Sequence, residues 1–99
     1  MNDSEQVPEP TPVPDMGATY QIGSDEYPYT ITRVSPSANT LWAKRCLVLT
    51  VDGARVYETP VNAREEKFTR RGDGRFRPTG RSCGCLTIGV RDFYLDPSF

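Results

Sequence analysis

The side chains best suited to chemistry in this sequence are arginines in its second half. Between positions 64 and 81 seven bases stand against three acids, and six of the seven are arginine. An arginine fork binds phosphate through two parallel hydrogen bonds and stacks on flat rings, which lysine does not do. The pattern indicates an anion-binding surface, and a solvated, ion-paired face is the alternative left open. The candidate ligand-binding residues here are Arg70, Arg71, Arg75 and Arg77.

A single tryptophan precedes two further bases. Trp42 is followed by Lys44 and Arg45, and an aromatic ring beside positive charge is a platform on which a nucleotide or a single strand can stack. Trp42 and Lys44 are therefore candidate ligand-binding residues. An ordinary core tryptophan is the open alternative, because large aromatic residues are well buried on average.

Two more candidates lie near the C-terminus. Arg91 and Tyr94 can line a pocket, or the aromatic residues around them can pack back on the body and close the fold. Asp92 and Asp96 are the pair of carboxylates to consider for acid–base catalysis, but beside an arginine such acids are typical of ion pairs. The segment is thus either a site or a structural closure.

Residue types that most catalysis needs are missing. The sequence has no histidine, the commonest general base and zinc ligand. Its three thiols, Cys46, Cys83 and Cys85, are one short of a four-ligand zinc site and follow no disulfide spacing. We therefore expect a binding protein and not an enzyme, with reduced cysteines, no metal and no cofactor.

Composition divides the 99 residues into two parts. Residues 1–16 hold four acids and no base, and proline stands at every second position from Pro8 to Pro14, which predicts a disordered, polyproline-like acidic tail. Residues 17–99 hold twelve bases and nine acids and form the predicted domain. This charge asymmetry favours an anionic partner. Neither a membrane-spanning run nor a signal peptide is present, which predicts a cytoplasmic protein without membrane contact.

Short β-type runs separated by turn residues fill the predicted domain. Asp52-Gly53 is the strongest hairpin signal, because a type I′ turn needs positive φ at both central positions. The apolar run 41–51 predicts one long strand that bends round a barrel. The sequence therefore predicts an all-β fold, a small SH3-like or OB-like barrel of five to six short antiparallel strands. The other predicted strands are residues 19–22, 29–34, 55–57, 68–71, 75–77 and 86–90.

One set of residues in the first half of the chain is Gly17-Ala18-Thr19, Ser24-Asp25 and Tyr27-Pro28-Tyr29-Thr30-Ile31, and a second set is Phe68, Gly74-Arg75-Phe76, Gly80 and Leu86-Thr87-Ile88. The closing stretch Gly89-Val90-Arg91-Asp92-Phe93-Tyr94-Leu95-Asp96-Pro97-Ser98-Phe99 is the most specific part. With these residues, most of the chain from Gly17 to Phe99 is similar to small phage and prophage proteins of unassigned function. The resemblance implies a phage origin and an SH3-like barrel, and it implies no activity. The stretch 50–67 is shorter in this chain than in the phage proteins that it resembles. Any function carried by that loop in those proteins is therefore in doubt here.

Small size, missing catalytic groups and the arginine-rich hairpin favour a binding protein, and the resemblance to phage proteins of this size implies a phage-encoded accessory protein that acts in the host cytoplasm. The first hypothesis is that it counters a host defence by binding, either sequestering a small anionic nucleotide or masking a host defence protein. A domain this small rarely encloses a nucleotide-sized pocket alone, so we expect a homo-oligomer with pockets between subunits. A nucleic-acid-binding module is the alternative, and a virion structural component is the second alternative.

Overall fold

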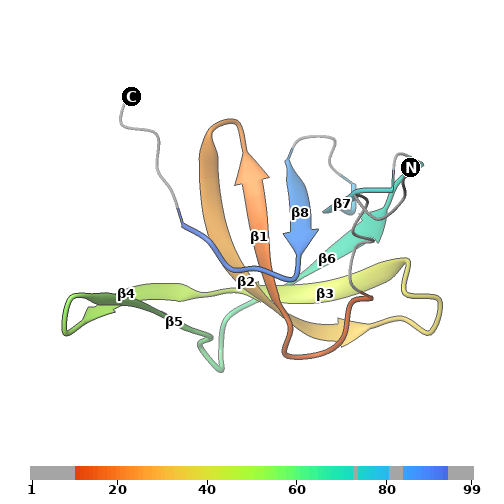
Figure 1. Ribbon diagram of the computed structural model, residues 1–99. Coiled ribbons are helices and arrows are strands. Elements are labelled where there is room, and N and C mark those ends of the chain that lie inside the picture. The colour runs from red at the N-terminus through yellow and green to blue at the C-terminus, as the bar shows by residue number, and fades with distance from the viewer. Residues whose placement is uncertain (1–10, 73, 81–83, 94–99) are drawn as a thin grey trace, which may run out of the picture.

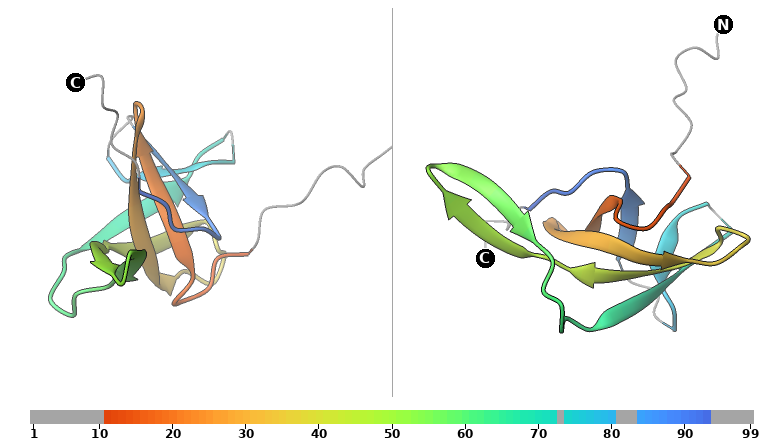
Figure 2. Two further views of the ribbon diagram at one scale, coloured as in Figure 1. Left: turned by 60° about the vertical axis from the view of Figure 1, so that its left-hand side comes forward. Right: turned by 90° about the horizontal axis from the view of Figure 1, so that it is seen from below.

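The computed structural model describes residues 11–72, 74–80 and 84–93. In these residues six antiparallel strands close into a barrel in the order β1-β2-β3-β6-β7-β8 (Figures 1 and 2). The prediction of a small all-β barrel of five to six strands is therefore confirmed. The barrel strands are β1 (Gly17–Ile22), β2 (Asp25–Val34), β3 (Thr40–Arg45), β6 (Glu65–Arg70), β7 (Phe76–Pro78) and β8 (Cys85–Ile88).

Two further strands, β4 (Leu47–Val51) and β5 (Ala54–Glu58), form a separate two-stranded sheet. Asp52 and Gly53 join them with φ angles of 52° and 79°, the positive values that a type I′ turn requires. Leu49 pairs with Val56, as the hairpin prediction expects. Figure 1 shows this hairpin, in green, extending sideways away from the barrel. We call it the β4–β5 arm.

The prediction of one bending strand over 41–51 is wrong. The run divides at Cys46, whose amide donates to the carbonyl of Pro28 at 2.9 Å, so β3 ends in the barrel and β4 leaves it. Leu41 in β3 is fully buried, whereas Leu47 and Val51 in β4 are about half exposed. The same kind of side chain therefore fills the core before Cys46 and faces solvent after it.

Three aromatic rings from three strands fill the centre of the barrel. Tyr20, Tyr29 and Phe68 lie edge to face, with ring centroids 5.7 Å, 5.7 Å and 5.8 Å apart, the geometry that ring quadrupoles favour. The hydroxyl of Tyr29 donates to Glu66 Oε2 at 2.9 Å. Burial, followed by this bond to an anion, raises the pKa of Tyr29 far above its usual value. The core thus satisfies its buried phenol with an inward-facing carboxylate.

The chain enters and leaves the barrel side by side. Asp15 donates its amide to Ile31, and the amide of Ile31 donates to Met16, so part of the predicted tail packs on the barrel ahead of the predicted boundary at Gly17. Residues 1–10 of that tail lie outside the described residues. Beyond β8, the hydroxyl of Thr19 donates to the carbonyl of Val90 at 2.7 Å. No helix in the described part of the chain is long and apolar enough to cross a membrane.

The division at Cys46 predicts unequal effects for two identical substitutions. Leu41→Ala should lower the free energy of unfolding by about 2–5 kcal/mol because it leaves a cavity in a closed core, whereas Leu47→Ala should lower it by less than about 1 kcal/mol. Urea denaturation of dilute protein measures both values. Equal losses would contradict the assignment of β4 to an exposed arm.

Candidate functional site

An irregularity in β2 determines which side chains reach the outer surface of the barrel. Ile31 pairs with Ala43, but Arg33, two residues on, pairs with Trp42 in the next position of β3. Thr32 is the extra residue of a β-bulge, which resets the alternation of the strand. Ile31 and Val34 therefore both pack on the core, and Arg33 turns outward instead of inward.

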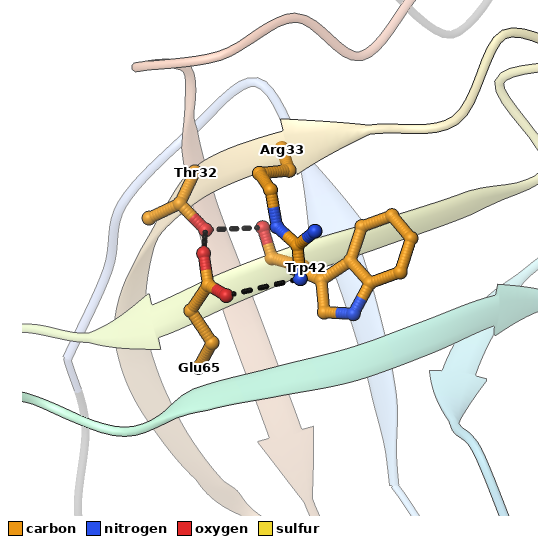
Figure 3. A network of polar contacts seen from close by, with 4 residues as sticks. All are labelled: Thr32, Arg33, Trp42 and Glu65. Atoms are coloured by element: carbon orange, nitrogen blue, oxygen red, sulfur yellow. Dashed lines mark hydrogen bonds and ion pairs between the residues drawn. The ribbon is translucent and has the colours of Figure 1, made fainter.

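Because of this bulge, three side chains stand in a row across three strands. Arg33 of β2 lies opposite Trp42 of β3, and Trp42 lies opposite Lys67 of β6. The guanidinium carbon of Arg33 is 4.2 Å from the centroid of the indole ring, and Lys67 Nζ is 5.9 Å from it. Both distances are within the range of a cation–π interaction. Figure 3 shows the guanidinium of Arg33 lying against the indole of Trp42.

Glu65 holds the arginine in this position. Arg33 Nη2 donates to Glu65 Oε1 at 3.2 Å, and the hydroxyl of Thr32 donates to Glu65 Oε2 at 2.6 Å (Figure 3). The hydrogen bond from Thr32, then the bond and charge of Arg33, lower the pKa of Glu65 below its usual value of 4.5. The carboxylate is therefore ionised at neutral pH and fixes the guanidinium, whose side chain is 59% exposed.

Two of the predicted site residues share this outward face with Trp42. Lys44 follows Trp42 at a spacing of two in β3, and its Nζ donates to the carbonyl of Val61 at 2.8 Å. Arg77 pairs with Thr69 of β6 and donates to the carbonyl of Gly84 at 3.2 Å. Because side chains two apart along a strand share a face, the outer surface of β2, β3, β6 and β7 carries one aromatic ring among cations. We call it the Trp42 face and define it by Arg33, Trp42, Lys44, Glu65, Lys67 and Arg77.

The other predicted arginines do not join the Trp42 face. Arg70 follows the inward-facing Phe68 at a spacing of two, its guanidinium carbon lies 4.5 Å from the centroid of the buried Phe76 ring, and it donates to the carbonyl of Gly74. Arg71 donates to the carbonyl of Pro78, and Arg75 is exposed in the turn before β7. Within the described residues these arginines make local contacts of the β6–β7 hairpin.

Arg91 lies on a different part of the barrel. Its Nε donates to the hydroxyl of Thr30 at 3.2 Å and its Nη2 to the carbonyl of Asp15 at 3.4 Å. A Cβ atom on Gly17 would lie 2.7 Å from Cγ of Arg91, so the glycine permits the arginine to pack flat on β1. These contacts favour the structural alternative, closure of the fold. Tyr94 lies outside the described residues, as do Arg81, Cys83 and Asp96.

Sequence reasoning missed Arg33 as a partner of Trp42. Two polar residues, Thr32 and Arg33, follow the apolar Ile31, but no local sequence feature marks a bulge at this position. Lys67 was one of the bases counted in the arginine-rich stretch, and its place beside Trp42 depends on the pairing of β3 with β6. Arg45, which follows Lys44, points away from the Trp42 face and lies over the ring of Tyr27 at 4.1 Å.

Hollows on the surface of the described residues include one beside the Trp42 face and one beside the β4–β5 arm. The first, of about 470 Å³, adjoins the Trp42 face and is lined by Arg64, Glu65, Glu66, Lys67, Pro78 and Thr79. The second, of about 460 Å³, lies where the β4–β5 arm leaves the barrel and is lined by residues that include Pro28, Cys46, Val48 and Phe93. Neither is lined by the predicted arginines, so a nucleotide pocket built from them stays a prediction.

Groups of three or more side chains suited to holding a metal ion are absent from the described ranges. Comparisons of the chain with known protein families, with curated proteins and with solved structures found no match. The resemblance to phage proteins, the host-cytoplasmic location and the roles inferred from them therefore stay predictions. What the structure adds is the geometry of the Trp42 face.

The contacts of Glu65 predict how its pKa responds to substitution. Thr32→Val removes the hydrogen bond with the largest effect, so the pKa of Glu65 should rise toward 4.5. A carboxyl-detected NMR pH titration measures the change. Thr69→Val, the same substitution on the same face, is the control and should leave the pKa of Glu65 unchanged. A pKa of Glu65 that stays low in Thr32→Val would contradict the network.

Proposed function

We propose that this protein is a non-catalytic module that binds single-stranded nucleic acid on its Trp42 face. The observation that carries the proposal is the Arg33–Trp42 pair, a ring and a guanidinium stacked at 4.2 Å on the outer surface of a small barrel. Single-strand binders combine such stacking surfaces with a positively charged path for the backbone. The Trp42 face offers both.

Stacking is the sequence-independent part of the interaction. The guanidinium of Arg33 is planar, and Glu65 and the indole hold it on two sides. A base can stack on this platform because every base has a π-face, and the gain is about 1–3 kcal/mol per stacked base. Preorganisation by Glu65 lowers the entropy lost when the base binds.

Phosphates would follow the cations on either side of the ring. Lys67 lies on one side of Trp42 and also lines the hollow that Arg64 borders. Lys44 lies beside Glu65, two residues along β3 from Trp42, and Arg77 lies beside Thr69, two residues along β6 from Lys67. Two carboxylates stand among these five cations: Glu65, whose charge is paired with Arg33, and Glu66, which accepts a hydrogen bond from Tyr29. The electrostatic balance therefore favours an anionic ligand.

A single anionic nucleotide is a second candidate ligand, because one platform with adjacent cations also fits one base and its phosphates. Salt dependence separates the two candidates. A strand that contacts several phosphates loses affinity steeply as salt rises, whereas a nucleotide held by two or three cations shows a shallow slope. The anti-defence role remains a proposal that depends on the second outcome. Masking of a host protein and a role in the virion remain predictions.

Trp42 itself reports on binding because it is the one tryptophan of the chain. Stacking of a base should quench its fluorescence during titration with an oligonucleotide of about 16 nucleotides, a length within known site sizes. Trp42→Ala should weaken binding about 5- to 150-fold, measured by anisotropy of a labelled strand. Trp42→Phe should retain most of the affinity. The control, Tyr57→Ala in the β4–β5 arm, should bind normally, and unchanged binding by Trp42→Ala would exclude the platform.

Lys67 should contribute charge and not stacking. Lys67→Gln should weaken binding and make the slope of log affinity against log salt shallower by about 0.7, the contribution of one phosphate contact to a single strand. Arg55→Gln removes the same charge from the β4–β5 arm and is the control. If both variants changed the slope equally, the effect would be one of net charge and not of the Trp42 face.

A further inference from the structure

The β4–β5 arm has one apolar face that residues 11–72, 74–80 and 84–93 leave uncovered. Leu47, Leu49 and Val51 alternate along β4, and Val56 pairs with Leu49 across the hairpin, so all four side chains lie on the same face. Their exposed fractions run from 39% for Leu49 to 51% for Val51. Contiguous apolar surface of this kind marks an interaction site on a soluble protein. We call it the Leu49 face.

The opposite face of the arm is partly covered: Val48 and Tyr57 are half-buried, whereas Thr50 and Arg55 are exposed. Arg55 and Tyr57 point to that side, and Arg55 Nη1 donates to the carbonyl of Phe93 at 3.0 Å while its guanidinium lies 5.5 Å from the Phe93 ring. The arm is thus fixed to the barrel through one face and presents the other outward. A two-stranded hairpin is marginally stable without a surface to pack on, so covering the Leu49 face would stabilise it.

We propose that a second copy of this chain covers the Leu49 face, and that two arms pack face to face across a two-fold axis. The face matches itself, because Leu47 and Val51 stand at equal distances on either side of Leu49. An axis over Leu49 places Leu49 on its counterpart and Leu47 on Val51 of the second copy. Charged residues stand only at the two ends of this face, Asp52 at the turn and Glu58 beside Leu47. Both are acidic, and the axis brings Glu58 of one copy near Asp52 of the other at the exposed rim, which limits the strength of association.

Symmetric dimers are the commonest homo-oligomers, and their interfaces use the same patch on both copies. Two such ribbons packed about 10 Å apart form a small sandwich with the four apolar side chains of each copy inside. The interface is small by the standard of stable dimers, so association should be reversible on dilution. This inference does not depend on the Trp42 face, which lies on the barrel and not on the arm.

Sedimentation velocity of the full chain from about 5 to about 500 µM tests the proposal, because dimer formation follows protein concentration. The wild-type protein should shift from monomer to dimer. Leu49→Lys should weaken association at least about a hundredfold, since it removes a buried leucine from each copy. Thr50→Lys is the matched control: it adds the same charge to the same strand on the opposite face and should leave association intact.

Three outcomes would overturn the proposal. A wild-type protein that stays monomeric over the whole concentration range would exclude a second copy as the occupant of the Leu49 face. A different partner would then have to cover that face. A dimer that survives Leu49→Lys would lie elsewhere on the surface. Equal losses in Leu49→Lys and Thr50→Lys would indicate pairing through the edge of β4 instead of packing through its face.

A measurement on the wild-type protein removes the ambiguity of a variant that fails to fold. In amide NMR spectra recorded at increasing concentration, residues 47–51 and 54–58 should shift while the indole signal of Trp42 should not. Leu49→Lys should also retain quenching of Trp42 by the oligonucleotide. Loss of dimerisation with normal quenching, or the reverse, would show which of the two proposals has failed.

Discussion

The rest of the structure depends on the edge-to-face packing of Tyr20, Tyr29 and Phe68 inside the closed barrel. The three rings come from β1, β2 and β6, so they fix which residues of these strands point inward. Since side chains alternate along a strand, every residue between two core positions must then point outward. The Trp42 face is the outer counterpart of this core: Trp42 lies between the buried Leu41 and Ala43, and Lys67 directly precedes Phe68.

Strict alternation would have placed Arg33 on the inside, where a guanidinium without a partner is costly. The bulge at Thr32 removes that conflict and at the same time brings Arg33 against the indole. Its extra residue also contributes, because the hydroxyl of Thr32 donates to the carboxylate that holds Arg33. One local departure from regular pairing therefore satisfies the core, the ion pair and the stacked pair together. Bulges are commonly used to re-aim side chains in this way.

The sequence predicted some of these structural elements correctly and others not. Asp52-Gly53 predicted its hairpin correctly because turn chemistry is local, and the number of short strands predicted a small barrel. The end of the barrel strand at Cys46 could not be predicted, because an apolar run has the same pattern in a core strand and in an exposed arm. Part of the site could be predicted: Trp42, Lys44 and Arg77 carry a signal in residue type, but their position relative to Arg33 depends on non-local strand pairing and on the bulge at Thr32.

The interior of the barrel has no room for a ligand, because its own side chains fill it. Phe68, Phe76, Ile31 and Leu41 are fully buried, and a barrel of this size is filled by its own side chains. A ligand of the proposed kind would then bind on an outer face or between molecules. The described chain offers one of each kind: a charged aromatic face on the barrel and an apolar face on the arm. Because they lie on different sheets, association through the arm leaves the barrel face open, and two linked faces would bind a long strand more tightly than either alone.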